Sequence, residues 1–291
     1  MIYLTDGIDV SRHQGYINWS KVKSSGVDFA MIRAGYGKYE SQKDPNFESN
    51  YQNAKAAGIK VGAYYYSYAK SVEDAKKEAE VFLKIIKGKQ FEMPVALDVE
   101  EKSQSDKGKA FVSDIIRAFC EKVEKAGYFV SVYANKYWLE NYIDDDCKRK
   151  YDIWLAHWAA QTDYSGSYGM WQNSSKGNIN GISGYCDTDK AYKDYPAIMR
   201  EYGLNGFKKS NPSGGSGSVT LAAGTMVSLH NTPVYVSATA KKYALKLTGT
   251  YYIYDGIDFK SRLRITNTLS RVGKMPISDN VTGYVNISDI K

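Results

Sequence analysis

The stretch "MPVALDVEEK", residues 93–102, is an apolar run that ends in two carboxylates set one residue apart. Because side chains alternate across a β-strand, Val95 and Leu97 should face one way while Asp98 and Glu100 share the other face. Two like charges on one face repel each other, so water, a cation or a chemical task must keep them there. The stretch therefore predicts a buried strand that ends either in solvent or in a functional site.

The sequence around this strand repeats one unit, in which a helical stretch is followed by a glycine and then by an apolar strand. The unit recurs at "SSGVDFAMIRAGYG", "AAGIKVGAYYYSYA", "KGKQFEMPVALDVE" and "KAGYFVSVYAN", with Gly26, Gly58, Gly88 and Gly127 as its glycines. Each glycine is expected to end a helix in the left-handed conformation. Strands that alternate with helices form parallel sheets, and about eight apolar strands fit in the first part of the chain. The pattern predicts a small β/α barrel.

Further acids stand at the expected ends of other strands. Asp9 belongs to the first strand, and Asp187 and Asp189 belong to the last. In β/α barrels the reacting groups lie at the carboxyl ends of the strands, and the first and last strands are neighbours. Acids from strands one, four and eight are therefore expected to surround one pocket together with Glu100.

Aromatic side chains are abundant near the same strand ends. The chain has 26 tyrosines, and the aromatic residues that finish or follow strands are Tyr36, Tyr64, Tyr66, Tyr133, Trp154, Trp158 and Trp171. Flat rings with a polar tip suit both the C–H face and the hydroxyls of a sugar. Carboxylates ringed by tyrosine and tryptophan favour a saccharide groove.

The motifs of the larger part resemble those of the glycoside hydrolase family 25 lysozymes, the muramidases common among phage endolysins. They are "GIDVSRHQGYINW", "FAMIRAGYG", "GAYYYSYA", "MPVALDVE", "WLAHW" and "MWQNSSKG", and the resemblance covers residues 5 to about 203. It implies a modified TIM-type β/α barrel that hydrolyses the β-1,4 bond between N-acetylmuramic acid and N-acetylglucosamine of peptidoglycan. No metal or cofactor is implied.

The resemblance also implies roles for individual residues. Glu100 is the proton donor, Asp98 its acidic partner, and Asp9 and Asp187 supporting carboxylates. The residues expected to bind substrate are Tyr64, Tyr66, Arg33, Tyr133, Trp154, His157, Trp171 and Gln172. The chain departs from the family pattern after the first strand, where it has Arg12, His13 and Gln14, and on the last strand, where Asp187, Thr188 and Asp189 replace Asp-Leu-Asn.

The expected chemistry follows from the glycosidic oxygen, which is a poor leaving group. A glycosidic oxygen must be protonated as its bond breaks, and crowding by Asp98 and aromatic walls would raise the pKa of Glu100 so that it still holds a proton near neutral pH. Asp98 either attacks the sugar directly or orients the substrate's acetamido group as the nucleophile. The second route, with retention of configuration, is the preferred expectation.

Two other classes of function fit parts of the pattern. A carboxylate cluster in a barrel could hold Mg²⁺ for proton abstraction, although His157 is the only Lys or His at a matching strand end. A non-catalytic protein could instead bind wall saccharides in the same groove. Nucleic acid is a poor fit, because the basic tail lacks dense Arg and Lys with stacking motifs.

The charge of the chain is unevenly distributed. The formal net charge is +7, and "KKSNPSGGSGS", residues 208–218, has the composition of a flexible linker. Residues 1–207 carry 28 bases and 28 acids, whereas residues 219–291 carry nine Lys plus Arg and four Asp. We therefore expect a neutral catalytic domain over 1–207 and a basic domain over 219–291.

The basic part is rich in short strands. They are "TLAAGTMVSLH", "TPVYVSA", "GTYYIYDG", "RLRITNT" and "GYVNISDI", which predict a small all-β barrel. It loosely resembles bacterial SH3-like wall-binding modules, so bacterial peptidoglycan and anionic wall polymers are the expected partners.

The N-terminal stretch, the apolar runs and the cysteines bear on where the protein is made and acts. The start "MIYLTDGIDV" lacks a basic segment followed by an apolar one, no apolar run is long enough for a membrane span, and the three cysteines lack a C-x-x-C spacing. We expect reduced thiols, no partner membrane, synthesis in the cytoplasm without a signal peptide, and release to the wall by a holin-type helper.

Overall fold

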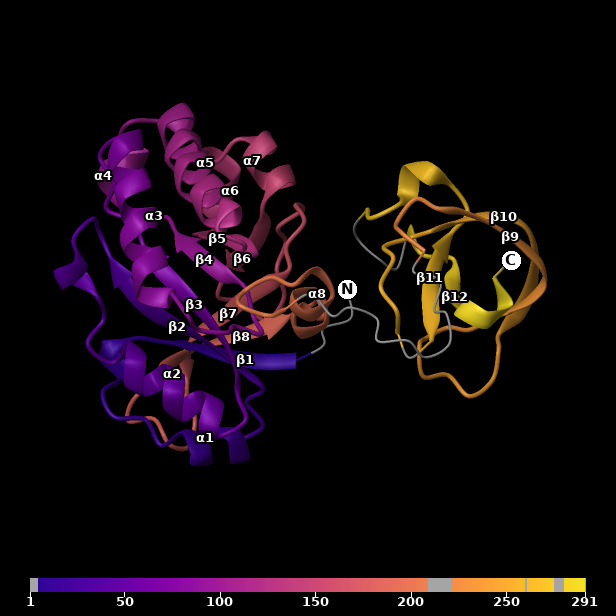
Figure 1. The fold of residues 1–291 in the computed structure, drawn as a ribbon, viewed down its shortest axis with the longest axis horizontal. Helices are drawn as coiled ribbons and strands as arrows, with labels where there is room; N and C mark the ends of the chain where they lie inside the picture. The colour runs from indigo at the N-terminus through magenta and orange to yellow at the C-terminus, as the bar shows by residue number, and fades with distance from the viewer. Residues whose placement is uncertain (1–4, 209–220, 260, 275–279, 291) are drawn as a thin grey trace. The chain divides into compact units, whose positions relative to one another are not determined.

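The computed structural model describes residues 5–208, 221–259, 261–274 and 280–290. The chain divides into two compact units, Ile2–Asn211 and Pro212–Lys291 (Figure 1). The linker expected over 208–218 lies, apart from Lys208, outside the described residues. The expected domain boundaries remain a prediction, and each unit is described below by itself.

The larger unit is a closed barrel of eight strands in sequence order, which confirms the expected barrel. The strands are β1 (Thr5–Val10), β2 (Phe29–Tyr36), β3 (Lys60–Tyr66), β4 (Val95–Asp98), β5 (Val130–Asn135), β6 (Asp152–Ala156), β7 (Met170–Gly177) and β8 (Cys186–Ala191). Neighbours from β1 to β7 pair in parallel, but β8 runs antiparallel to both β7 and β1. The expectation that the last strand ends at the same face as the first is therefore wrong. Only eight residues, 178–185, join β7 to β8, and a parallel crossover needs about a dozen or more.

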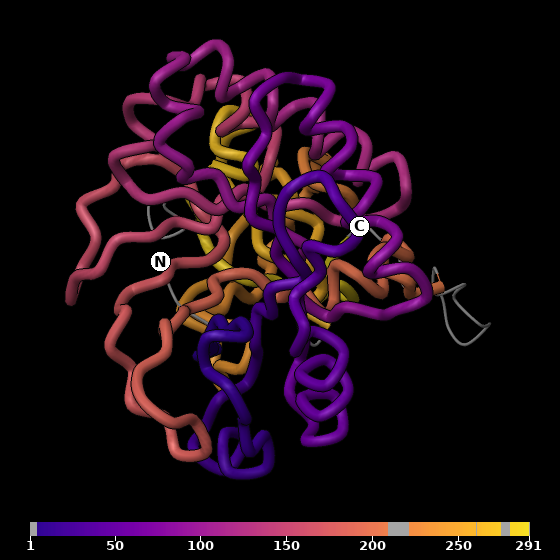
Figure 2. The backbone as a smooth tube through the Cα atoms, turned by 90° about the vertical axis from the view of Figure 1, so that its left-hand side faces the viewer, coloured from indigo at the N-terminus to yellow at the C-terminus, as the bar shows by residue number. Residues whose placement is uncertain are grey.

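Helices surround this barrel. They are α1 (Trp19–Ser24), α2 (Phe47–Ala56), α3 (Val72–Ile86), α4 (Lys102–Ser105), α5 (Lys109–Lys125), α6 (Lys136–Asn141), α7 (Asp145–Lys150) and α8 (Tyr195–Tyr202). Figure 1 shows α3 to α7 on one side of the barrel and α1 and α2 on the other, and Figure 2 shows the same helices in a view turned by 90°.

The helix ends are those that the sequence predicts. The side chain of Ser71 accepts a hydrogen bond from the Asp74 amide at the start of α3. Gly26, Gly58, Gly88 and Gly127 all have positive φ, between 75° and 90°. A glycine adopts this conformation without the steric cost that a Cβ would bring, so each unit stops its helix and turns back into a strand.

The side chains on the two faces of the barrel strands belong to two different apolar clusters. Val95 and Leu97 pack outward against the helices, whereas Ala96 belongs to the inner cluster. Phe29 fills the barrel at the level of Gly7, where a Cβ would lie 2.3 Å from the phenyl ring. Bulky apolar residues thus fill the part of the barrel where the parallel strands begin, and the polar inward residues lie toward the other end.

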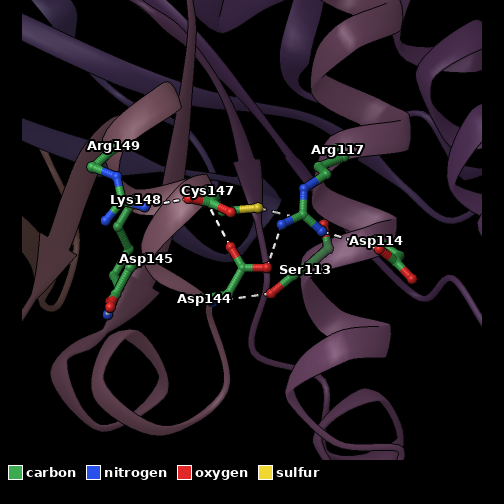
Figure 3. Close-up of polar contacts among 9 residues, drawn as sticks. Ser113, Asp114, Arg117, Asp144, Asp145, Cys147, Lys148 and Arg149 are labelled. Carbon is green, nitrogen blue, oxygen red and sulfur yellow. Dashed lines mark hydrogen bonds and ion pairs between the residues drawn. The ribbon is translucent and has the colours of Figure 1, made fainter.

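Helix α7 is fixed to α5 by the polar cluster in Figure 3. The Asp144 carboxylate accepts a hydrogen bond from the Cys147 amide at 2.8 Å and forms an ion pair with Arg117, while the Asp144 amide donates to Ser113 Oγ at 3.0 Å.

Cys120, Cys147 and Cys186 are all free and buried. These thiols serve as packing groups of the core.

The smaller unit is an antiparallel sheet in the order β12-β11-β10-β9. Its strands are β9 (Met226–Val234), β10 (Leu245–Ile253), β11 (Arg262–Thr266) and β12 (Gly283–Asn286), and a bridge between Tyr235 and Tyr284 joins the two outer strands. The all-β prediction is confirmed, and the likeness to SH3-like modules stays a prediction.

One detail of the strand prediction for this unit is wrong. The two strands expected on either side of Asn231 are one continuous strand, β9. Asn231 has a φ of 53°, and the pairing with β10 shifts register at this point. An irregularity of this kind absorbs an extra residue without ending a strand.

Candidate active site

Four aspartates reach the same end of the barrel from three strands. Asp9 lies on β1 and Asp98 is the last residue of β4, while Asp187 pairs directly with Asp9 across the β1–β8 ladder. Because β8 is antiparallel, its first residues meet the last residues of β1. The structure thus brings together the acids expected from strands one, four and eight, but Asp187 stands near the beginning of its strand and Asp189 in its middle, rather than at its end.

The acids differ in their exposure. Asp9, Asp98 and Asp189 are buried, with 7%, 5% and 1% of their surface exposed. Asp187 is half-buried, and Glu100 is exposed just beyond β4. The arrangement places one accessible carboxyl at the mouth of the site and a layer of buried carboxyls beneath it.

A single amide side chain connects this layer to the aromatic residues. Gln172 Nε2 donates a hydrogen bond to Asp9 Oδ2 at 2.7 Å. Gln172 Oε1 accepts hydrogen bonds from Tyr133 Oη at 3.1 Å and from Trp158 Nε1 at 2.9 Å. Three partners therefore fix the orientation of the amide, which directs its N–H toward Asp9.

The electrostatic environment opposes ionisation of every acid in the cluster. Burial raises the pKa values of Asp9 and Asp98 well above the usual range, and neighbouring carboxyls raise them further. Loss of hydration raises the pKa of Glu100 although the side chain is exposed, and Asp187 and Glu101 act in the same direction. Within the described residues, none of these acids forms an ion pair with Lys, Arg or His. The cluster is suited to holding and releasing protons.

A groove of about 500 Å³ opens beside Glu100. Its lining residues are Glu100, Tyr133, Asn135, Lys136, Tyr137, Glu140, Ala156, His157 and Trp158. Trp158 is 62% exposed there, with its indole N–H anchored to Gln172. An exposed ring held in a fixed orientation is suited to stack against a sugar.

A second group of rings lies on the other side of the acids. Tyr68 packs against Tyr66 and Tyr36, with ring centroids 4.8 Å and 5.9 Å away. Tyr66 Oη donates to Glu101 Oε2 at 3.3 Å. Aromatic surfaces therefore flank the acids on both the β2–β3 side and the β5–β6 side.

The residues expected to bind substrate occupy several different kinds of position. Tyr133 and His157 line the groove, Gln172 lies beneath it, and Tyr66 belongs to the second group of rings. Arg33 forms an ion pair with buried Asp44, at 2.8 Å from Nε, and is the one cation that lowers the pKa of Asp98. Tyr64 and Trp154 lie in the inner cluster, 9% and 1% exposed.

The structure does not bring Trp171 to the groove. Its ring is buried in the outer cluster, and its indole N–H donates to the His157 carbonyl at 2.8 Å. Both faces of a barrel strand are buried, so the alternation along "MWQ" does not tell inside from outside. Sequence reasoning also missed Asn135 and Lys136 of the groove, although Asn135 ends β5 just as Asp98 ends β4.

A buried glutamate supports the loop between these groups. Glu78 of α3 is 1% exposed and accepts hydrogen bonds from Ser67 Oγ at 2.7 Å and from the Tyr68 amide at 2.8 Å. Ser67 Oγ also accepts from Gln104 Nε2 at 3.0 Å, and the Ser67 amide donates to the Asp98 carbonyl at 3.0 Å. The network ties the segment after β3 to the strand that carries Asp98.

We expect Glu78→Ala to lower the free energy of unfolding by about 3 kcal/mol, since it leaves two buried donors without an acceptor. Burial raises the pKa of Glu78 to about 7. A carboxyl whose pKa is raised by folding contributes stability below its ordinary pKa, and this stability is lost as the pH rises through the pKa of the folded protein. The free energy of unfolding lost in Glu78→Ala should therefore be larger at pH 5 than at pH 8. Urea unfolding at both pH values measures it.

Exposed Glu73 on the same helix is the matched control, and Glu73→Ala should change the stability far less. An equal effect of the two substitutions, or a loss in Glu78→Ala that grows with pH, would contradict this account of the network.

The chain was compared with known proteins. Residues 8–182 match the family described as Glycosyl hydrolases family 25. The chain is 31% identical over 185 residues to the autolytic lysozyme of Clostridium acetobutylicum, covering 63% of this chain and 55% of that protein. It is also 31% identical over 201 residues to lysozyme M1 of Streptomyces globisporus, covering 63% and 66%. The chain thus spans about half to two thirds of these curated relatives.

Solved structures share the barrel. The bacterial lysozyme from Streptomyces coelicolor is 32% identical with a TM-score of 0.56, and the match covers 65% of this chain and 92% of that one. The CTP1L endolysin is 26% identical with a TM-score of 0.60, covering 67% and 69%.

Proposed function

The chain belongs to glycosyl hydrolase family 25, and from this premise we propose that its barrel hydrolyses the β-1,4 bond between N-acetylmuramic acid and N-acetylglucosamine of peptidoglycan. The observation that carries the proposal is one accessible carboxyl, Glu100, set between an aromatic groove and a layer of buried acids. The curated relatives named as lysozymes support the same substrate.

In the proposed reaction, Glu100 protonates the leaving oxygen. A general acid must hold its proton at the working pH, and partial loss of hydration together with the Asp187 charge supports this by raising its pKa. As the bond breaks, positive charge develops at the anomeric carbon. The carboxylates of Asp9 and Asp98 beneath Glu100 stabilise that charge.

Asp98 is proposed to act on the same sugar. Its Oδ1 is buried and accepts no hydrogen bond from the residues that the structure describes. A buried acceptor without a donor is costly, and the N–H of a substrate acetamido group would satisfy it. This favours substrate assistance, in which Asp98 orients the acetamido group whose oxygen attacks the anomeric carbon.

The direct experiment is to incubate the protein with purified peptidoglycan and measure new reducing ends. Their appearance supports hydrolysis, and binding to the wall without new ends would support a saccharide-binding protein instead.

We further propose that the smaller unit binds anionic wall polymers. It is rich in basic residues: Lys241 and Lys242 are exposed on the segment before β10, and Lys246 is exposed on β10 itself. The only buried ion pair described within this unit joins Arg264 to Asp255, so that acid does not oppose the exposed charge. A basic module attached to a neutral enzyme raises the enzyme's concentration near an anionic substrate.

Removing residues 208–291 should therefore weaken adsorption to cell walls at low salt, while cleavage of soluble glycan fragments continues at a nearly unchanged rate because every proposed acid precedes residue 208. Added salt should reduce adsorption of the intact protein more than that of the shortened protein, since screening limits the range of interactions between exposed charges to about 8 Å at physiological ionic strength. Sedimentation with purified walls measures adsorption.

A charge-matched pair of variants separates charge from size. Lys→Gln at 241, 242 and 246 should weaken adsorption, whereas Lys→Gln at exposed positions 21, 87 and 125 of the barrel unit should not. Equal adsorption of the intact and shortened proteins at low salt would show that the smaller unit has another role.

A further inference from the structure

Asp189 is the most deeply buried acid of the cluster, and the reaction proposed above gives it no task. It lies on the inward face of β8, where it is paired with Gly7 of β1 and Gln172 of β7. Only 1% of its surface is exposed. It therefore cannot contact a sugar in the groove.

The hydrogen bonds of Asp189 are incomplete for a carboxylate. Its Oδ1 accepts from Trp154 Nε1 at 2.8 Å, but its Oδ2 is buried and accepts from no described donor. The amide N–H of Gln172, which could have served it, is directed to Asp9 instead. A buried carboxylate oxygen without a donor is costly, whereas a protonated one is itself a donor.

The groups around Asp189 make a second negative charge costly. Asp9 faces it from β1 and Asp187 from its own strand, and Asp98 on β4 adds a further acid beside Asp9. Glu100 adds a carboxyl facing Asp98, and the other titratable groups facing these acids, namely Tyr64, Tyr133 and Cys186, are neutral at pH 7. Among the described residues, Arg33 is the cation of this region, and it is already paired with Asp44.

Asp189 and Asp9 come from neighbouring strands, where Asp187 pairs with Asp9 and Asp189 pairs with Gly7, and the charge of Asp189 raises the pKa of Asp9. Two ionised carboxyls so close together in a buried site repel each other, so the pair is expected to keep one proton. Each carboxyl already receives one N–H, Asp9 from Gln172 and Asp189 from Trp154, so the proton belongs to the pair.

We propose that Asp189 is a positioning residue that shares one proton with Asp9 at neutral pH, so that the two carboxyls together carry one negative charge. The shared proton links the two carboxyls, while Asp189 accepts from Trp154 and Asp9 accepts from Gln172. Asp189 thereby holds Asp9 in place beneath the reacting sugar. The inference concerns the site of the proposed function, but its first test does not use that activity.

The test compares thermal unfolding of the wild type and Asp189→Asn from pH 5 to pH 9 at constant ionic strength. Burial raises the pKa of Asp189 to about 8. The stability from such a group is complete below its ordinary pKa and is lost as the pH rises through about 8. Asn is neutral at every pH, so Tm of the variant minus Tm of the wild type should increase with pH.

Two comparisons separate this role from simple packing. Asp44→Asn removes a buried acid that has a cation partner, so its Tm difference should not increase with pH. Asp189→Ala should lower kcat at least tenfold, and Asn, which can accept from Trp154 and donate to Asp9, should recover most of that loss.

A Tm difference for Asp189→Asn that is constant or falls with pH would overturn the proposal, and so would an Asn variant as inactive as the Ala variant. If neither variant folds, the wild type still decides. A wild-type unfolding free energy that does not fall between pH 5 and pH 9 would show that no proton is retained.

Discussion

Glu100→Gln should abolish wall lysis, lowering kcat by about 10²- to 10⁴-fold or more, because an amide cannot give a proton to the leaving oxygen. Glu100 is exposed at the mouth of the groove and lies outside the apolar clusters, so the variant should fold normally and still adsorb to peptidoglycan. Reducing-end assays on purified peptidoglycan measure the loss, and circular dichroism checks the fold.

The matched control is the neighbouring acid. Glu101 accepts a hydrogen bond from Tyr66 rather than opening into the groove, so Glu101→Gln should cost far less activity than Glu100→Gln. Retained lysis in Glu100→Gln, or equal losses in the two variants, would remove Glu100 from its proposed role.

Asp98→Asn should lower kcat by about 10²-fold or more, since it removes the carboxylate that is proposed to act on the reacting sugar. Its effect on stability should have the opposite sign. Burial raises the pKa of Asp98, so the ionised form opposes folding at neutral pH, and a neutral Asn removes that cost. Tm at pH 7 should therefore stay the same or rise while activity falls. This combination is expected where a site is built from uncompensated charge.

Asp44 provides the contrast, because it is equally buried but has Arg33 as its partner. Asp44→Asn should lower Tm, as it leaves the half-buried guanidinium of Arg33 without its carboxylate partner. Full activity in Asp98→Asn would contradict the role of Asp98, and a large loss of Tm would show that the inactivity reflects unfolding.

The parts of the fold that sequence predicts are those fixed by local rules. The glycines that end α1, α2, α3 and α5 require positive φ, and this repeated requirement marks each helix-to-strand turn. The antiparallel direction of β8 departs from this repeated pattern, and the cause of the departure is also local. No helix lies between β7 and β8, and the eight residues that join them favour a hairpin.

The site is only partly predictable for a different reason. The acids of the first and fourth strands could be placed in one pocket from the repeated strand–helix pattern, but the reversed direction of β8 was missed and the side of each strand that faces the barrel interior could not be predicted. Trp171 and Gln172 are adjacent and both buried, and only the packing of the whole barrel decides that Gln172 faces the acids. The burial that distinguishes Asp189 from Asp187 likewise depends on neighbours distant in sequence.

The most direct test of the central claim is to identify the new reducing sugar released from purified peptidoglycan by the intact protein. After borohydride reduction, mass spectrometry of the products should show N-acetylmuramitol at the new ends and none from Glu100→Gln. Reduced N-acetylglucosamine at those ends, or no new ends from the wild type, would contradict the account.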